Sequence, residues 1–132
     1  MPVFSLPGKY GIGTLGEEAY RFIDLLCETG NKVWQILPMG PTGFGDSPYQ
    51  AFSAFAGNPY FIDLDTLVKE GLLTQEEINA CYWGEDPAQV AYDAVFWYRF
   101  PLLKKAYARS EYREEQGYEK FCMDSWFWLN DY

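Results

Sequence analysis

Residues 32–60 read KVWQILPMGPTGFGDSPYQAFSAFAGNPY, and this stretch decides how the rest of the chain is interpreted. It begins with an apolar run, residues 33–37, which predicts a short β-strand. It continues as a long segment rich in Gly, Pro, Ser and aromatic residues, which predicts an ordered loop. Barrel enzymes present functional side chains in this way, because a rigid strand fixes the loop that follows it. The stretch therefore indicates a barrel-type scaffold that carries a binding loop.

The loop combines two kinds of side chain that together suit a carbohydrate. Its aromatic and short polar residues are Phe44, Tyr49, Phe52, Phe55 and Tyr60, and Asp46, Ser47, Gln50, Ser53 and Asn58. A sugar ring has apolar C–H faces that can pack on flat rings, and a hydroxyl edge that needs hydrogen-bonding partners. Burial of the same rings in a core would explain them equally well, and composition leaves both interpretations open.

The residues before the loop predict a strand–helix–strand unit. Residues 3–6 offer a first short strand, and Thr14-x-x-Glu17 predicts a capping box that opens an amphipathic helix ended by Gly30. With the strand at 33–37, this order predicts a right-handed crossover between two parallel strands. The first part of the chain is therefore expected to begin an α/β barrel.

The residues after the loop predict helices joined by turns, at 64–72, 74–82, 93–109 and 111–132. Thr74-x-x-Glu77 is a second predicted capping box, and Pro101 either kinks or restarts the third of these helices. A short extended piece is expected at 61–63 and a turn at 83–87. Six aromatic side chains in periodic segments are expected in the core, namely Phe22, Trp34, Trp97, Phe100, Phe121 and Trp126.

Charge and composition exclude several classes of function. The 132 residues carry 10 basic and 19 acidic side chains, a formal charge of −9 and a pI near 4.3. This charge repels phosphate backbones and anionic lipids, so neither nucleic acid nor a membrane is expected as a partner. Histidine is absent, which excludes Ser–His and Cys–His catalysis and His-ligated metal sites within this chain. The spacing of Cys27, Cys81 and Cys122 predicts reduced, buried thiols in a cytoplasmic protein.

Two glycine-rich patterns match phosphate-binding motifs only superficially. Gly11-x-Gly13-x-x-Gly16 has the spacing of a dinucleotide-binding loop, but Pro7 interrupts its approach and no acidic residue ends the following predicted strand. Residues 40–45, GPTGFG, lack the Gly-Lys-Ser/Thr ending of a phosphate-binding loop. The glycines of both patterns are therefore expected to shape turns.

The carboxylates nearest the loop do not define a catalytic pair. Glycoside chemistry with retention needs two carboxyl groups about 5 Å apart, and no spacing here places any two in that way. Asp46 is expected to bind a ligand or fix the loop, and Asp63 and Asp65 are expected to cap a helix. The aromatic density at residues 126–132 and a sheet of only two strands favour a fragment of a larger domain.

Two long blocks, SLPGKYGIGTLGEEAY (5–20) and WQILPMGPTGFGDSPYQAFSAFAGNPYFIDL (34–64), resemble the start of amylomaltase, the 4-α-glucanotransferase also called disproportionating enzyme. The segments EGLLTQEE, PLLKKAY and WLNDY follow in that family's order. The resemblance implies a retaining α/β-barrel enzyme that moves α-1,4-glucan segments between chains without a metal or organic cofactor. Its Asp nucleophile, Glu acid–base and second Asp belong to later strands, so no catalytic residue is assigned to this chain.

The resemblance also implies four substrate-binding residues. Tyr49 is similar to the family's aromatic platform beneath the sugar next to the cleaved bond, and Asp46 and Ser47 match positions that line the same cleft. Phe44 falls where many members have Tyr, at a place associated with a second glucan contact. A ring at this position can still stack on a sugar, but it lacks the phenol hydrogen bond.

We therefore expect an α/β chain that supplies the first two strands of an incomplete TIM-type (β/α) barrel. Residues 1–63 would hold the strand–helix–strand unit and the glucan-binding loop, and residues 64–132 a helical insertion. The expected partners are α-1,4-glucans and the remainder of the barrel, and the chain alone is expected to be inactive. Two other interpretations stay open: a non-enzymatic glucan-binding module, and a truncated product that does not fold alone.

Overall fold

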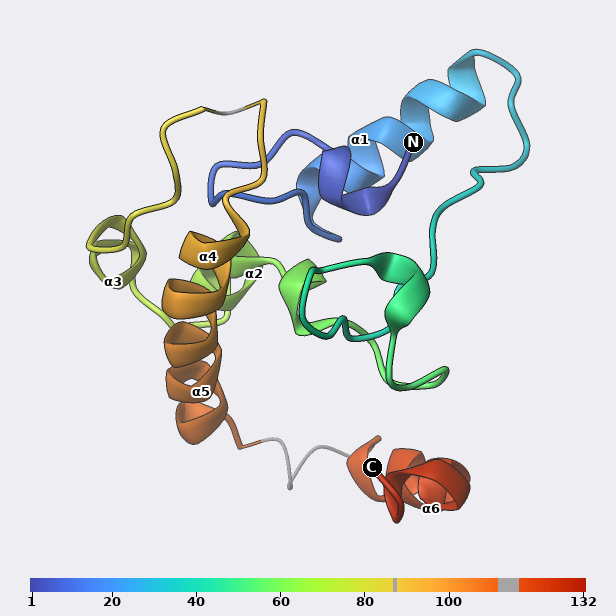
Figure 1. Ribbon diagram of the computed structural model, residues 1–132, viewed down its shortest axis with the longest axis vertical. Helices are drawn as coiled ribbons and strands as arrows, with labels where there is room; N and C mark the ends of the chain where they lie inside the picture. Colours follow the sequence, from blue (N-terminus) through green and yellow to red (C-terminus); the bar gives the residue numbers. More distant parts are fainter. Residues whose placement is uncertain (87, 112–116) are drawn as a thin grey trace.

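Helices and long ordered loops build the molecule (Figure 1). The computed structural model describes residues 1–86, 88–111 and 117–132. The α-helices of these residues are α1 (Glu17–Glu28), α2 (Leu64–Lys69), α3 (Gln75–Asn79), α4 (Tyr92–Ala94), α5 (Phe100–Arg109) and α6 (Tyr118–Leu129). A π-helical turn covers Val95–Arg99, and 3₁₀ turns cover Val3–Ser5, Pro48–Gln50 and Pro59–Phe61.

The two predicted strands do not form in the described residues. Val3–Ser5 is a 3₁₀ turn, and residues 33–37 are extended but belong to no ladder, with the Val33 side chain 81% exposed. A strand needs a neighbouring backbone that takes its N–H and C=O groups. Strand-like pairing is limited here to an isolated antiparallel bridge between Thr42 and Ala51. The prediction of two barrel strands is therefore wrong for this structure.

Helix α1 forms where the sequence predicts a helix, but its first turn is built differently. Gly16 is the N-cap and has no side chain with which to cap the helix. The Thr14 hydroxyl donates instead to the Asp63 carboxylate, with an Oγ1–Oδ1 distance of 2.8 Å. The first predicted capping box is therefore wrong. The end at Gly30 is confirmed: its φ is 78°, and the Asn31 N–H donates to the Leu26 carbonyl over 2.8 Å.

The caps of α2 and α3 follow the sequence closely. Asp63 caps α2 by accepting from the Thr66 N–H over 2.8 Å, as expected for a capping carboxylate. Thr74 and Glu77 form the second predicted capping box, with bonds of 3.3 and 3.0 Å between side chain and backbone. Both helices are shorter than predicted, since α2 ends at Lys69 and α3 at Asn79.

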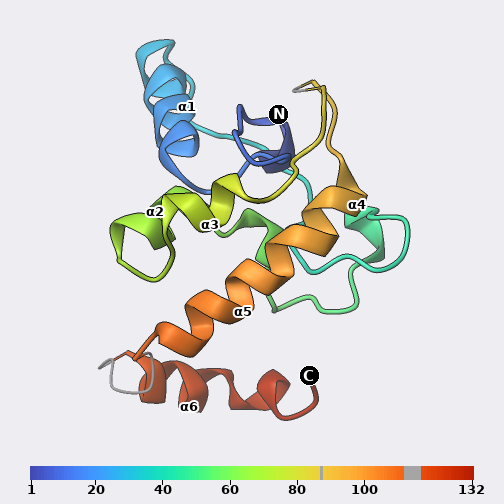
Figure 2. The ribbon, with the colours of Figure 1, turned by 90° about the vertical axis from the view of Figure 1, so that its left-hand side faces the viewer.

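The predicted helix over 93–109 is a single column that contains a wide turn. Tyr92–Ala94, the π-helical turn Val95–Arg99 and Phe100–Arg109 follow one another without a break (Figures 1 and 2). Pro101 lies in the first turn of α5, directly after the π-helical turn. Proline has no N–H and its ring crowds the carbonyl four residues earlier, which accounts for a wide turn at this place.

Two apolar clusters hold the loops and helices together. The first contains Val3, Leu6, Ile12, Ala19, Tyr60, Phe61 and Val95, and the second contains Tyr10, Leu64, Leu73, Ile78, Leu102 and Ala106. Each cluster therefore joins the glycine-rich N-terminal loop to the α4–α5 column, which in turn fixes the loops that precede α2. Arg99 is fully buried, and its guanidinium donates to the backbone carbonyl of Tyr10 in the second cluster.

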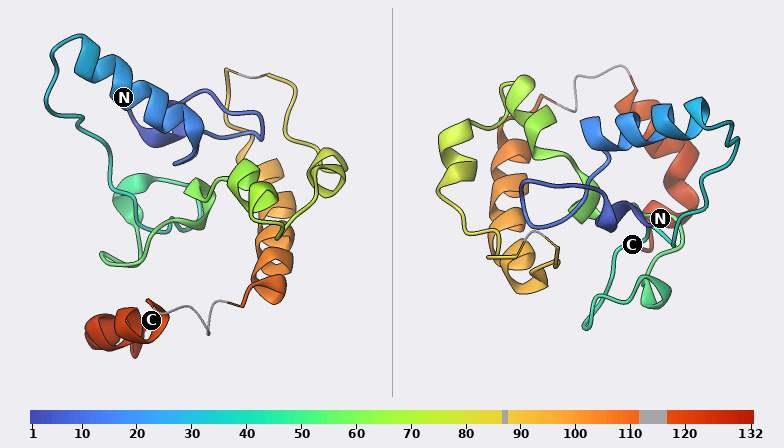
Figure 3. Two further views of the ribbon diagram at one scale, coloured as in Figure 1. Left: turned by 180° about the vertical axis from the view of Figure 1, so that it is seen from behind. Right: turned by 90° about the horizontal axis from the view of Figure 1, so that it is seen from above.

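The aromatic residues expected in the core divide into two groups. Phe22, Trp34 and Phe100 pack against the first cluster, so these predictions are confirmed. Trp97, Phe121 and Trp126 are more than half exposed, so the prediction is wrong for them. Helix α6 instead sets part of its aromatic side against the loop at 52–55, where the Phe55 and Phe127 ring centroids are 5.1 Å apart. Figure 3 shows α6 below this loop in a second view.

The predicted last helix is shorter than the sequence suggested. Helix α6 covers Tyr118–Leu129, and residues 112–116 of the predicted stretch lie outside the described residues. The extended piece expected at 61–63 begins instead within the 3₁₀ turn Pro59–Phe61 and becomes extended at Ile62 and Asp63. Of the turn expected at 83–87, residue 87 lies outside the described residues, and Gly84 has a φ of 97°.

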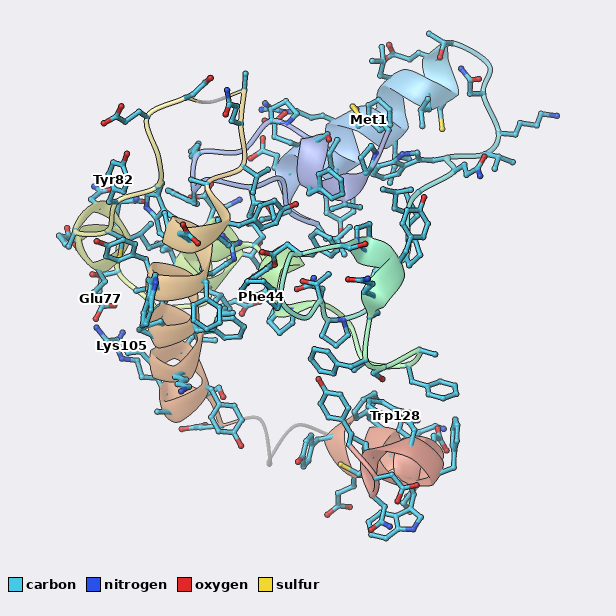
Figure 4. All side chains as sticks on the ribbon, viewed as in Figure 1. Met1, Phe44, Glu77, Tyr82, Lys105 and Trp128 are labelled. Atoms are coloured by element: carbon cyan, nitrogen blue, oxygen red, sulfur yellow. The ribbon has the colours of Figure 1, made fainter. Side chains whose placement is uncertain are left out.

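Glu77 joins α3 to α5 and gives the fold a pH-dependent contact. Its carboxylate lies 2.8 Å from an Arg109 nitrogen and 2.9 Å from the Lys105 ammonium, and its side chain is 19% exposed. Figure 4 shows Glu77 and Lys105 side by side against the α5 column. The hydrogen bonds from Arg109, then those from Lys105 and the Thr74 N–H, hold the pKa of Glu77 well below its usual range.

We expect the Glu77 contact to weaken in acid. Its folded pKa lies below the unfolded value of about 4.3, so its stabilisation is complete above that pH and is lost as the pH falls. Urea unfolding at pH 6 and pH 3 should show a smaller fall in the midpoint for Glu77→Gln than for the unchanged chain. Glu28→Gln, on the exposed end of α1, is the control and should not alter the pH dependence. An equal fall in the urea midpoint between pH 6 and pH 3 for all three chains would contradict this prediction.

Candidate functional site

A cleft of about 710 Å³ lies between the loop at 41–46 and the α4–α5 column. We call it the loop cleft. Its walls come from the loop (Thr42, Phe44, Asp46), from the segment before α2 (Asn58, Tyr60) and from the column (Tyr92, Asp93, Phe96, Phe100). Figure 4 shows Phe44 at the edge of the loop that faces the column. The central stretch of the sequence and a helix face far from it in the chain therefore meet at one hollow.

The loop reaches the cleft through an unusual backbone turn. Asp46 has a φ of 51°, which only a few per cent of residues other than glycine adopt, and the preceding Gly45 has a φ of 90°. The turn is held by a bond from the Asp46 N–H to the Gly43 carbonyl over 3.2 Å, and Asp46 Oδ1 accepts from the Thr42 hydroxyl over 3.2 Å. Left-handed backbone at a residue of this kind is often found at binding sites.

Asn58 fixes the opposite wall of the cleft. Its N–H donates to the Met39 carbonyl over 2.8 Å, and its side-chain oxygen accepts from the Tyr60 N–H over 3.0 Å. Asn58 is only 9% exposed, and its backbone N–H and side-chain oxygen both form hydrogen bonds within the loop. Tyr60 is held in the first core cluster and packs on Phe100, with the ring centroids 5.7 Å apart. This wall is therefore rigid.

The cleft offers apolar ring surface together with a carboxylate. Phe44 is completely exposed, and Phe96 and Phe100 meet edge to face with their ring centroids 5.4 Å apart. Burial raises the pKa of Tyr60 and Tyr92, and the negative charge of Asp46 raises both further. Both phenols are therefore protonated at neutral pH. Phenol donors beside a carboxylate acceptor can bind a hydroxyl-rich ligand of no net charge.

The structure brings two of the four predicted substrate-binding residues into this cleft. Phe44 and Asp46 line it, and Asp46 also fixes the loop. Ser47 is half-buried at the start of the 3₁₀ turn Pro48–Gln50, and Tyr49 within that turn is 74% exposed. Ser47 and Tyr49 do not line the loop cleft, so together the four residues form a strip along one loop rather than a single pocket.

The column residues of the cleft were missed by the sequence reasoning. Tyr92, Phe96 and Phe100 follow one another at intervals of four, which places them on one side of a helix. That periodicity predicts a core stripe as readily as a binding face, so it carried no functional signal. Asp93 is a second carboxylate on the cleft, and no motif marks it.

Three other features of the chain bear on its chemistry. In the described residues no group of three or more His, Cys, Asp or Glu side chains is arranged to hold a metal ion. None of the helices in the described ranges has the length and apolar character needed to cross a membrane. All three cysteines are free thiols, but Cys27 is exposed and Cys81 and Cys122 are half-buried, so the prediction of buried thiols is wrong.

An exposed aromatic loop beside a cleft with carboxylate and phenol groups offers ring faces and hydrogen-bonding groups together. Comparison with known proteins identifies the family directly. The family model described as 4-alpha-glucanotransferase matches residues 1–132, and the chain belongs to that family. The resemblance recognised in the sequence is thereby confirmed.

Individual relatives agree with the family match. The chain is 48% identical over 132 residues to the 4-alpha-glucanotransferase of Clostridium butyricum, covering 100% of this chain and 27% of the relative. It is 49% identical over 130 residues to the enzyme of Streptococcus pneumoniae TIGR4, covering 98% of this chain and 26% of that protein. The chain therefore spans about a quarter of the length of these relatives.

A solved structure shares the fold of the chain. Amylomaltase from Streptococcus agalactiae, determined in complex with acarbose, superposes with a TM-score of 0.81 and 46% identity. The match covers 94% of this chain and 25% of that one. That neighbour is a TIM-barrel enzyme, so the observed arrangement of helices and loops is that of one part of a barrel protein.

Proposed function

We propose that this chain provides a glucan-binding wall of a 4-α-glucanotransferase, and that the loop cleft holds part of an α-1,4-glucan. The observation that carries the proposal is the position of Phe44 and Asp46, which belong to the family's sequence block and line a cleft beside the Tyr92 phenol. The ring of Phe44 would pack on the C–H face of a glucose unit, and Asp46 and the phenols would bind its hydroxyls. Tyr49 and Ser47 would contact the neighbouring units of the glucan.

We place the catalytic groups of the reaction outside this chain. In a retaining transfer a carboxylate attacks the anomeric carbon, while a carboxylic acid gives its proton to the departing glycosidic oxygen. A hydroxyl of a second glucan then attacks the glycosyl-enzyme and returns a proton to that acid, so that one glycosidic bond replaces another. The division into residues 1–63 and a helical insertion over 64–132, the remaining barrel as partner and a cytoplasmic location belong to the same proposal.

The inactivity of the isolated chain follows from this assignment. Maltotriose incubated with the 132-residue chain should give no longer or shorter maltodextrins when the products are separated by chromatography. Glucan transfer by the chain would contradict the assignment. Asp46→Asn and Asp93→Asn would then show whether the two carboxylates on the loop cleft are responsible.

Phe44 gives the sharpest test of glucan binding. Its side chain is fully exposed, so Phe44→Ala should leave the free energy of unfolding within about 0.5 kcal/mol of the original value. Loss of a stacking ring costs about 1–3 kcal/mol in nucleic-acid platforms, and by analogy we expect maltotriose to bind about 5- to 150-fold more weakly. Isothermal titration calorimetry measures this change.

Matched variants show whether the ring itself is responsible. Phe44→Tyr restores the phenol common in the family and should bind maltotriose at least as tightly as the original chain. Tyr20→Ala is the aromatic control, because Tyr20 is 68% exposed on α1 and does not line the loop cleft, and this variant should bind maltotriose like the original chain. The proposal is wrong if Phe44→Ala and the unchanged chain bind maltotriose equally well.

A stand-alone glucan-binding module is the second candidate function. The exposure of Tyr49 at 74% favours it, because the ring is available without the rest of a barrel. Saturable maltodextrin binding by the isolated chain, weakened by Tyr49→Ala, would support binding as a function at this length. Absence of such binding, with transfer activity in a longer protein, would favour the barrel enzyme alone.

A further inference from the structure

A second and larger cleft, of about 800 Å³, lies on the other side of Tyr92. It is formed by the glycine-rich loop at 4–13 and by residues 83–86 and 88–90 of the chain between α3 and α4. We call it the glycine cleft. Figure 1 shows these two loops, in blue and in yellow, facing one another beyond the α4 end of the column. Its volume lies within the range of about 300–1,000 Å³ that small-molecule sites occupy.

The walls of the glycine cleft are firmly held. The Trp83 indole N–H donates to the Ile78 carbonyl over 3.1 Å, and the ring packs on Tyr10 with their centroids 5.7 Å apart. Gly11, with a φ of 76°, passes so near that a Cβ on it would lie 2.9 Å from the Trp83 carbonyl oxygen. The Arg99 guanidinium donates to the Tyr10 carbonyl from within the core. The two loops are thus locked together behind the cleft.

The lining of the glycine cleft suits a neutral, hydroxyl-rich ligand. Trp83, Phe4 and Tyr92 give it ring surface, and Glu85 and Gln89 are exposed on its rim. No hydrogen bond to the side chain of either rim residue occurs among the described residues, so both are available to a ligand.

The same lining excludes a phosphate. The Lys9 ammonium on the rim is paired with Asp65 over 3.0 Å, which leaves the carboxylates of Glu85 and Asp86 in excess. Anionic ligands such as nucleotides are repelled by this charge. The glycines of the loop also pack against backbone, as Gly13 does against Val3, and leave no open N–H cradle.

The two clefts share a lining residue and are therefore neighbours. Tyr92 lines both of them, together with a small hollow between them that shares Phe4 with the glycine cleft and Asp46 with the loop cleft. A linear glucan that leaves the loop cleft across Tyr92 therefore arrives at the glycine cleft.

We infer that the glycine cleft is an additional saccharide site, which takes further glucose units of the same α-1,4-glucan. This inference rests on the glucan binding proposed for the loop cleft. It predicts that long maltodextrins use both clefts and that short ones use the loop cleft alone. Trp83 and Gln89 would then contact only the longer ligands.

Binding of maltotriose and maltoheptaose to the 132-residue chain tests the inference. Gln89→Ala and Glu85→Ala each remove the hydrogen-bonding side chain of one rim residue and should weaken maltoheptaose binding about two- to tenfold. Both variants should leave maltotriose binding unchanged, whereas Phe44→Ala weakens both ligands. Gln35→Ala, an exposed glutamine on neither cleft, is the matched control and should bind like the original chain.

The NMR signal of the Trp83 indole N–H gives a second measurement, which detects the ligand without a variant that weakens binding. This signal, assigned through Trp83→Phe, should shift with maltoheptaose and stay in place with maltotriose, while the Trp34 indole moves with neither. If the chain binds maltoheptaose but the Trp83 signal and the Gln89→Ala affinity do not change, the inference is wrong and the proposed function stands. If the chain binds neither glucan, the proposed function is wrong and the inference falls with it.

Discussion

Replacement of Arg99 by alanine is expected to lower the free energy of unfolding by about 3–5 kcal/mol. Arg99 heads the fully buried side chains by volume, and its exposure is 0%. Truncation would leave a cavity in the protein interior and remove the donors to the Ile62 and Tyr10 carbonyls. Because a domain of this size is stable by only about 5–15 kcal/mol, urea unfolding of Arg99→Ala should show a large fall in the midpoint.

The expectation rests on what the guanidinium holds in place. Its Nη2 donates to the Ile62 carbonyl over 2.6 Å and its Nη1 to the Tyr10 carbonyl over 3.5 Å, while its Nε has no partner among the described residues. Burial lowers the pKa of Arg99 to about 10, and the charge of Asp63 opposes this only partly. The side chain is therefore a cation that ties three segments of chain to one another through backbone oxygens.

A methionine variant separates packing from hydrogen bonding. Arg99→Met keeps most of the buried volume but removes the charge and the donors, so its loss should be about 1–2 kcal/mol. The difference between the alanine and methionine variants then measures the cavity. Arg99→Ala would contradict the prediction if it cost less than 1 kcal/mol, on the order of a single ordinary hydrogen bond. A methionine chain more stable than the original would show that burial of the cation outweighs its two bonds.

Arg99 also explains why the loop cleft keeps its shape. It lies at the end of the π-helical turn, and its bond to Ile62 fixes that turn against the segment that carries Asn58 and Tyr60. Two of the three walls of the cleft, the column and the segment before α2, therefore depend on one buried side chain. We expect Arg99→Met, if folded, to bind maltotriose more weakly than the original chain although no atom of Arg99 lines the cleft.

Local signals predicted the parts of this fold that depend on neighbours in the sequence. Gly30, Asp63 and the Thr74–Glu77 box each end or begin a helix where their chemistry requires, because a cap needs partners only three or four residues away. The Thr14–Glu17 box failed, since a distant carboxylate, Asp63, offers the Thr14 hydroxyl a better partner. That competition is invisible in the local pattern.

Tertiary pairing decided the rest. Residues 33–37 have the composition of a strand, but a strand exists only where another backbone runs beside it, and none does in the described residues. The loop residues of the candidate site, Phe44 and Asp46, were recognised through the family block. The column residue Tyr92 was missed, because its spacing with Phe96 is also that of an ordinary core stripe.

Gly13→Ala is the second substitution expected to have a large effect, and it tests what the Gly11-x-Gly13-x-x-Gly16 pattern is for. A Cβ on Gly13 would lie 2.2 Å from the Val3 carbonyl oxygen and 2.7 Å from that of Leu6. Both are backbone atoms of the first core cluster, which cannot move aside as a side chain would. We expect a loss of about 3 kcal/mol or more, at the upper end for overpacked sites.

Two glycine variants bracket this prediction. Gly57→Ala meets no atom within 4 Å and should be neutral or slightly stabilising, because alanine reduces the freedom of the unfolded chain. Gly16→Ala would meet the Asp63 side chain at 2.4 Å, which can rotate, so its cost should fall between the other two. Urea unfolding of the three variants should rank them in that order.

The same experiment decides between packing and ligand binding at the glycine loop. If the glycines existed to receive a pyrophosphate, Gly13→Ala would fold normally, and NAD or ATP would raise the melting temperature of the original chain but not of the variant. If they exist for close packing, the variant is destabilised and neither nucleotide has any effect on the original chain. The contact of Gly13 with Val3 and the excess carboxylates of Glu85 and Asp86 both favour the second outcome. The glycine spacing then records how closely this loop must approach its own core, and it leaves the cleft beside it open to an uncharged ligand.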